Sequence, residues 1–389
     1  MPASKPTVHG SCADEFIAVK HEFERNFVER GEVGASVSVV AGGKVVVDLW
    51  AGTSDAALTL PWHRDTLTNV WSVSKGMTAI VAHQLADSGD LDLDAAVAHY
   101  WPEFAAAGKA DIPVRWLLSH RSGVVGLAPE QEALTADDLY DWEKVTSLLA
   151  AQAPFFEPGT VSGYQAISYG FLVGEVIRRV TGGTVGGYFA RNVAEPLDVD
   201  FLLGSVPPQD DGRCSEVLEP APAPEIEAAM AHVLMAGGRA AQAALLNPRP
   251  LGRMANNPAW RRAEIPSVNG HGTARALAVI YGVLADGSDR LLSAGALERA
   301  RTSQGRCMDA VVGVWGEFGL GFTLGSDESS FGPNPKAFGH DGFGGSTGCA
   351  DPERGVGFGY VMNQMGPLLR DDPRKMALLS ALYGALDRA

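Results

Sequence analysis

The residues best suited to chemistry are a serine and a lysine three positions apart, Ser72 and Lys75, in the segment Trp-Ser-Val-Ser-Lys. Because residues i and i+3 share one face of a helix, the lysine amine can lie beside the serine hydroxyl. Burial lowers the pKa of a lysine, which lets the amine accept the serine proton. The alternative is a helix-capping serine followed by an exposed lysine. Of eight lysines, only Lys75 has a serine three residues before it.

The place of Ser72 in the sequence adds a second effect, because a helix is predicted from about Ser72 to Gly89. The start of a helix carries unpaired backbone N–H groups and the positive end of the helix dipole. Both stabilise a negative charge that develops on a substrate oxygen. Ser72 is therefore a candidate nucleophile that also contributes to an oxyanion site.

Tyr164 is the next candidate. It lies in the loop Gly-Tyr-Gln-Ala at residues 163–166, ahead of a predicted helix over 169–177. A phenol at this junction can relay a proton between the serine, the lysine and a leaving group. A tyrosine in a glycine-rich loop more often serves packing, and Tyr169 is a rival for the same role.

A glycine-rich segment follows at residues 338–346, and we expect it within an edge strand. Its glycines would let a substrate approach the backbone closely, and one of its N–H groups could complete an oxyanion hole with that of Ser72. The residues expected in the substrate cleft are His340, Asp341, Gly342 and Gly344. We expect His340 to line the cleft or support the structure rather than act as a base. The alternative is a plain glycine-rich hairpin.

The same segment contains a motif that points to a different enzyme class. Residues 344–348 read Gly-Gly-Ser-Thr-Gly, which matches the G-x-S-x-G nucleophile elbow of α/β-hydrolases. That fold requires an acid and then a histidine after the serine. All nine histidines, the last being His340, precede Ser346. We therefore interpret this match as fortuitous.

The elements that must position these residues are strands at both ends of the chain and helices between them. Hydrophobic periodicity predicts helices over 13–30 and 373–386, and strands over 35–40, 44–50, 319–324, 337–340, 346–350 and 356–361. This order predicts an α/β domain built from residues 1–85 and 266–389, with a mainly helical domain inserted at 86–265. A ligand site is expected in the cleft where the two domains meet.

Composition limits the possible partners. The 389 residues, 46% of them hydrophobic, indicate a globular protein, and the net charge of −15 disfavours nucleic acid and anionic membranes. The four widely spaced cysteines indicate free buried thiols rather than a metal site or a disulfide framework. Neither a leader-like N-terminus nor a long apolar segment is present, which predicts a cytoplasmic protein. The sequence gives no prediction of oligomeric state.

Taken together, the three motifs resemble those of the serine β-lactamase and penicillin-binding-protein superfamily, in the class C-like branch that includes the family VIII carboxylesterases. The order matches: S-x-x-K near residue 70, a tyrosine motif about 90 residues later and a glycine-rich strand near the C-terminus. The stretches at 111–123 and 269–275 are also similar. The resemblance extends from about Gly34 to the final helix and implies the β-lactamase-like α+β fold, with an antiparallel sheet flanked by helices.

The resemblance also implies roles for individual residues. Ser72 matches the nucleophile, Lys75 its base and Tyr164 the tyrosine of the Y-x-N element. Residues 340–342, His-Asp-Gly, stand where β-lactamases have K-T-G. By the same match, the backbone N–H groups of Ser72 and Phe343 would form the oxyanion hole. No metal and no organic cofactor are implied.

Two departures from the family pattern bear on the substrate. Ala166 replaces the asparagine of Y-x-N, and the C-terminal motif has no lysine. Groups that hold a β-lactam are thus missing, which favours a serine carboxylesterase acting on short-chain, small-molecule esters. The alternatives are a β-lactamase, a D-aminopeptidase-type hydrolase or an acyltransferase with the same acyl-enzyme. An alternative of another class is a non-catalytic binding protein with this fold.

Overall fold

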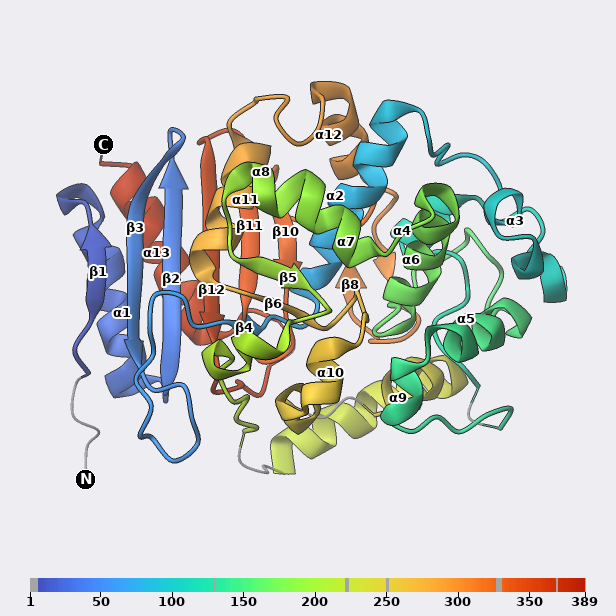
Figure 1. Ribbon diagram of the computed structural model, residues 1–389, viewed down its shortest axis with the longest axis horizontal. Coiled ribbons are helices and arrows are strands. Elements are labelled where there is room, and N and C mark those ends of the chain that lie inside the picture. The colour runs from blue at the N-terminus through green and yellow to red at the C-terminus, as the bar shows by residue number, and fades with distance from the viewer. Residues whose placement is uncertain are drawn as a thin grey trace.

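A computed structural model describes residues 6–128, 130–220, 224–249, 252–326, 331–368 and 370–388. A large sheet lies on one side of the molecule and a mainly helical region on the other, with both ends of the chain on the side of the sheet (Figure 1). The helix α2 (Val73–Ser88) lies between these two regions.

The large sheet has seven strands in the order β1-β3-β2-β12-β11-β10-β9, and every neighbouring pair is antiparallel. Its strands are β1 (His9–Cys12), β2 (Gly34–Ala41), β3 (Lys44–Gly52), β9 (Thr323–Leu324), β10 (Phe338–Asp341), β11 (Thr347–Asp351) and β12 (Val356–Met362). The two ends of the chain meet at the centre, where β2 pairs with β12. Residues on both faces of these two strands are buried, because helices cover both sides.

Three helices cover the sheet. On one face α1 (Ile17–Glu29) packs against α13 (Pro373–Leu386), and α11 (Ala274–Ala285) lies on the other face (Figure 1). A Cβ atom at Gly357 of β12 would lie only 2.2 Å from the backbone nitrogen of Gly282. The glycines therefore let α11 lie directly on the strand backbone.

The helical region and its connections complete the fold. Its helices are α3 (Val97–Tyr100), α4 (Val114–Leu118), α5 (Trp142–Ala151), α6 (Ser168–Thr181), α7 (Val185–Phe189), α8 (Glu195–Leu197), α9 (Pro224–Leu246) and α10 (Pro258–Arg262), and α12 (Ala294–Arg301) follows later. Short 3-10 or π segments lie at 14–16, 102–108, 137–140, 190–194, 208–213 and 252–256. One small sheet has three strands in the order β4 (Thr68–Asn69), β6 (Gly270–Gly272) and β5 (Phe201–Leu203). A second consists of β7 (Cys307–Met308) and β8 (Trp315–Gly316). The division into two domains at residues 85 and 266 stays a prediction.

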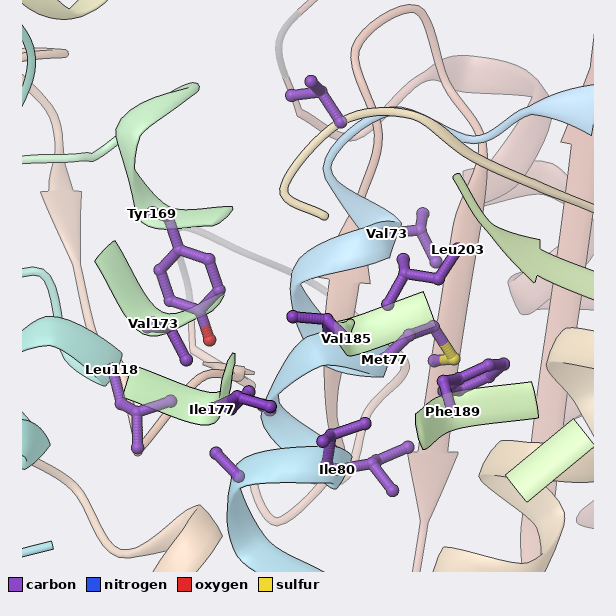
Figure 2. Packing of buried hydrophobic residues seen from close by; sticks show 14 of the residues in the cluster. Val73, Met77, Ile80, Leu118, Tyr169, Val173, Ile177, Val185, Phe189 and Leu203 are labelled. Carbon is purple, nitrogen blue, oxygen red and sulfur yellow. The ribbon is translucent and has the colours of Figure 1, made fainter. Parts of the chain in front are cut away.

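Helix α2, which follows the candidate nucleophile Ser72, is buried on nearly every side. Figure 2 shows it between apolar side chains of α6 and those of α7. A helix that is apolar all round belongs in a core, and this one ends at Gly89, whose φ of 87° provides the left-handed C-cap. The core thus fixes the start of α2, where Ser72 and Lys75 lie.

The predicted fold class is confirmed, with corrections in detail. Only Thr323–Leu324 of the strand predicted over 319–324 is a strand, because Gly319 donates its N–H to Phe322 O and closes a turn. β10 is not an edge strand, since β9 pairs along its outer side. The periodicity missed β1 and the short strands β4 to β8, which are too short to show alternation.

Two expectations from composition can also be compared with the structure. Among the described residues, no helix is long and apolar enough to cross a membrane. The four cysteines are free, as expected, but only Cys349 is buried; the other three are partly exposed.

Candidate active site

The structure brings Ser72, Lys75 and Tyr164 together. Lys75 Nζ lies 3.0 Å from Ser72 Oγ, and the Tyr164 hydroxyl donates a hydrogen bond of 2.9 Å to the same oxygen. Ser72 occupies the N-cap position of α2, yet its side chain makes no capping hydrogen bond. Lys75 is fully buried. The alternative of a capping serine with an exposed lysine is therefore wrong.

The surroundings of the Lys75 amine favour a base. Its Nζ lies 2.8 Å from Ala166 O and 3.2 Å from Ser267 O, in addition to its contact with Ser72. A neutral amine has two N–H donors and one lone pair. Since the two carbonyl oxygens can only accept hydrogen bonds, they take both N–H groups. The lone pair then faces the Ser72 hydroxyl.

The electrostatics agree with this geometry. Burial lowers the pKa of the Lys75 ammonium well below its ordinary value, and desolvation is the one cause of this shift found among the described residues. Burial also raises the pKa of the Tyr164 phenol, with its hydrogen bond to Ser72 acting in the opposite direction. Burial therefore favours the neutral form of the amine and keeps the phenol protonated.

The rival Tyr169 has a different place. It lies on α6 among apolar side chains of the core (Figure 2) and is fully buried. Its hydroxyl donates a long hydrogen bond of 3.5 Å to the main-chain oxygen of Lys75. Tyr164 is the tyrosine that contacts the serine.

The residue before Ser72 has an unusual backbone conformation. Trp71 has φ of 49°, which is a true outlier for a bulky side chain. Its buried ring packs against Trp260 and meets Phe343 edge to face, each at a ring-centre distance of 5.7 Å. This packing holds the strained turn into α2 and links Ser72 to the glycine-rich segment, which carries the second expected oxyanion donor.

The glycines of residues 338–346 allow this segment to pack closely against the backbone of other parts of the chain. A Cβ atom at Gly342 would lie 2.2 Å from Val70 O, so the β10–β11 turn touches the backbone that leads into Ser72. Gly344 has φ of 92°, and its carbonyl accepts hydrogen bonds from Gly366 N–H and the Arg374 guanidinium. We expected a substrate to approach the backbone of this segment closely. At Gly342, Val70 occupies that position instead.

His340 and Asp341 have separate surroundings. The His340 ring lies 6.3 Å from the Tyr164 ring, and burial, reinforced by Lys75, lowers the pKa of His340 to about 3. Its Nδ1 lies 2.7 Å from Asp341 O. The Asp341 carboxylate accepts hydrogen bonds from Lys375 and the Thr347 hydroxyl. His340 is thus a neutral neighbour of Tyr164, whereas Asp341 is held by α13.

The G-x-S-x-G motif has no accessible serine. Ser346 lies at the end of the β10–β11 turn and is fully buried. A buried hydroxyl cannot reach a substrate carbonyl, which agrees with the interpretation of this motif as fortuitous.

Several contacts at the site were not predicted from the sequence. Ala166 and Ser267 act through main-chain carbonyls, which no residue type signals. His120 lies under Tyr164 with 4.9 Å between ring centres, and it belongs to the stretch 111–123 noted for its resemblance. Asp309 accepts the Tyr164 N–H at 3.2 Å. No motif marks it.

Among the described residues, no group of three or more His, Cys, Asp or Glu could hold a metal ion.

The aromatic residues of the insert divide into two groups. Trp101 is buried in the main core. Phe155 and Phe156 instead pack with Tyr164 in a small cluster whose buried members are Val125, Ala244 and Val311.

Comparison with known proteins identifies the family. A family model described as Beta-lactamase matches residues 21–383. The chain belongs to the beta-lactamase family. It is 36% identical over 386 residues to the esterase/beta-lactamase LipL of Mycobacterium tuberculosis, covering 95% of this chain and 86% of LipL.

Solved structures agree with this membership of the beta-lactamase family. A family VIII carboxylesterase superposes with a TM-score of 0.90 at 42% identity, covering 97% of this chain and all of that one. A penicillin-binding-protein homologue from Caulobacter crescentus gives 0.89 at 38% identity, with the same coverage. The expected β-lactamase-like fold and the resemblance to this group of serine hydrolases are confirmed.

Proposed function

We propose that this beta-lactamase family member is a serine carboxylesterase that forms an acyl-enzyme on Ser72. The proposal rests on one observation: Ser72 Oγ lies between Lys75 Nζ at 3.0 Å and the Tyr164 hydroxyl at 2.9 Å, in a site where the amine is buried without a counter-ion in the described residues. Lys75 and Tyr164 would act as a pair, with the amine as the base and the phenol as the relay.

Acylation begins when the Ser72 proton moves to the lone pair of Lys75. Oγ then attacks the ester carbonyl carbon, and the carbonyl oxygen becomes an oxyanion. When the bond to the leaving alcohol breaks, the alcohol oxygen takes the phenol proton of Tyr164. The extra proton on Lys75 restores the phenol, which leaves an acyl-enzyme and a neutral alcohol.

Backbone donors would stabilise the oxyanion. The N–H groups of Ser72 and Phe343 are the proposed donors. This is supported by contacts of their neighbours, since the Trp71 ring meets the Phe343 ring and Gly342 lies close to Val70 O. In deacylation a water molecule loses a proton to the Lys75–Tyr164 pair and attacks the acyl carbon. The bond to Oγ breaks, and Oγ takes a proton back.

The proposed substrates are small carboxylic esters. The relatives named above include an esterase/beta-lactamase and a carboxylesterase, while this chain has Ala166 at the motif asparagine and His340 at the motif lysine. His340 is neutral at physiological pH because of its depressed pKa. It therefore offers no fixed positive charge to a β-lactam carboxylate, which favours an ester as the substrate.

The direct test replaces Ser72 with alanine. Ser72→Ala should lower kcat for p-nitrophenyl butyrate by about 10³-fold or more and abolish labelling by a fluorophosphonate probe, because the attacking oxygen is gone. Ser380→Ala, on the exposed face of α13, is the matched control and should leave both unchanged. Full activity in Ser72→Ala would rule out the acyl-enzyme.

The same preparation distinguishes the alternatives. Wild-type protein should hydrolyse p-nitrophenyl butyrate faster than nitrocefin, and added methanol should divert only a minor share of acyl groups to methyl ester. Faster nitrocefin turnover would indicate a β-lactamase, and dominant ester product an acyltransferase. Failure of the wild type to react with the probe would instead indicate a binding protein.

A further inference from the structure

The segment that carries Tyr164 is bound along its length by the β7–β8 hairpin. Ser162 donates its N–H to Cys307 Sγ at 3.3 Å, and its carbonyl accepts the Ala310 N–H at 2.8 Å. Tyr164 donates its own N–H to Asp309 Oδ1 at 3.2 Å. The hairpin thus contacts the tyrosine loop at the residue that reaches the nucleophile.

We infer that Asp309 is a positioning residue for the reaction, because its carboxylate fixes the backbone of Tyr164 so that the phenol stays within hydrogen-bonding distance of Ser72. The inference rests on the proposed role of Tyr164. Asp309 does not touch the reacting atoms. It acts only through the tyrosine.

The carboxylate of Asp309 is itself held rigidly. Its Oδ1 also accepts the N–H groups of Val311 and Val312, at 2.8 and 2.9 Å. The main chain of Asp309 closes the same turn, since its N–H donates to Val314 O and its carbonyl accepts the Gly313 N–H, both at 3.0 Å. One oxygen atom therefore joins the hairpin turn to Tyr164, and the turn cannot shift without moving the tyrosine.

The burial of Asp309 is more than a hairpin turn requires. Asp309 is only 2% exposed, and its Oδ2 is buried without a hydrogen-bond partner among the described residues. Burying an unsatisfied carboxylate oxygen is unfavourable, and burial raises the pKa of Asp309 while its three N–H donors lower it. An exposed aspartate would cap the turn equally well. The buried position is explained by the contact with Tyr164.

The residues on either side of Tyr164 are bound to His120, because Gly163 donates its N–H to His120 O at 2.9 Å and Gln165 donates its N–H to His120 Nδ1 at 3.3 Å. The N–H of Tyr164 itself is held by Asp309. Residues 163–166 lie in irregular structure between α5 and α6, and Gly163 precedes the tyrosine. A displacement of about 1 Å at a reacting group can reduce a rate by about 10²-fold. We therefore expect loss of the Asp309 contact to change the distance from the phenol to Ser72.

The test is a double-mutant cycle with a structural measurement. Asp309→Ala should lower kcat for p-nitrophenyl butyrate by about tenfold or more, with KM within about twofold, whereas Asp309→Asn, which keeps one acceptor oxygen, should retain most of kcat. In a Tyr164→Phe background, Asp309→Ala should change kcat by less than about twofold. A crystal structure of Asp309→Ala should show the phenol moved away from Ser72.

The matched control is Asp351→Ala. Asp351 is equally buried and caps the β11–β12 turn by accepting the N–H groups of Glu353 and Arg354, but it lies at the far end of β11 from the site. It should lower stability without changing kcat. If Asp309→Ala does not fold, Asp309→Leu, which fills a similar volume without an acceptor, replaces it.

The outcomes separate the two proposals. An unmoved Tyr164 in the Asp309 variant, an equal loss of kcat in both backgrounds, or a loss in Asp309→Asn as large as in Asp309→Ala would overturn the positioning role. Full activity of Tyr164→Phe alone would overturn the proposed relay, and the crystal structure would still decide whether Asp309 positions the tyrosine.

Discussion

The hydroxyl of Ser72 can accept one hydrogen bond and donate another, and the protonation of its two neighbours sets the direction of each. The Tyr164 phenol is protonated and donates to Oγ. The two N–H groups of a neutral Lys75 amine are taken by Ala166 O and Ser267 O. The serine proton is therefore directed at the lysine lone pair. A polar group with a defined hydrogen-bond direction needs no reorganisation when the reaction begins.

The protonation of Lys75 should set the acid limb of the pH profile. Because only the neutral amine accepts the serine proton, kcat/KM should fall as the pH drops through the depressed pKa of Lys75, with a slope of one. His340, with a pKa of about 3, stays neutral in this range. His340→Gln should therefore keep the acid limb in place. An acid limb that disappears in this variant would assign the base to the histidine instead.

Among the elements, the turn between β10 and β11 matters most to the site, since it carries Phe343 towards the start of α2. The sequence predicted both strands and the closing helix at 373–386 within a residue or so, because alternation and helical periodicity are strong there. It did not predict what the glycines contact. That depends on Val70, which lies some 270 positions earlier and is brought close only by the folded sheet.

Gly342→Ala tests this turn. The new methyl group would lie 2.2 Å from Val70 O and push the turn away from Ser72, which separates the two proposed oxyanion donors. We expect kcat to fall by about 10²-fold with a smaller change in KM. Gly212→Ala, with no atom within 4 Å of the added Cβ, is the control for an ordinary glycine substitution. Unchanged kcat in Gly342→Ala would remove the turn from the catalytic account.

Across the molecule as a whole, the N- and C-terminal segments are joined by a buried charge cluster as well as by the sheet. The Arg374 guanidinium pairs with Glu32 and Asp372, and Glu32 also accepts a hydrogen bond from the Tyr360 hydroxyl. The family could be predicted from local sequence motifs, and so could the residues that meet at the candidate site, Ser72, Lys75 and Tyr164. The buried charge cluster could not be predicted in this way, because Glu32 and Arg374 lie 342 positions apart and its members share no motif.

Removing the arginine should destabilise the fold. Arg374→Met leaves two buried carboxylates without their partner, and we expect the free energy of unfolding to fall by about 3–5 kcal/mol. Arg25→Met, which breaks a pair with Glu22 and Glu29 on the surface, is the matched control and should leave the urea midpoint almost unchanged. Equal shifts of the two midpoints would contradict a special contribution from the buried cluster.

The two oxygens that orient the Lys75 amine come from peptide groups, and every residue has one. Exchanging the side chain at position 166 or 267 for another therefore leaves the lysine's acceptors intact, provided that the path of the chain is kept. Tolerance to mutation should be higher at position 166 than at position 267, because the buried Ser267 hydroxyl also donates a hydrogen bond of 2.6 Å to Ile167 O. A search for this activity in other genomes that insists on an asparagine two residues after the tyrosine would pass over proteins built in this way.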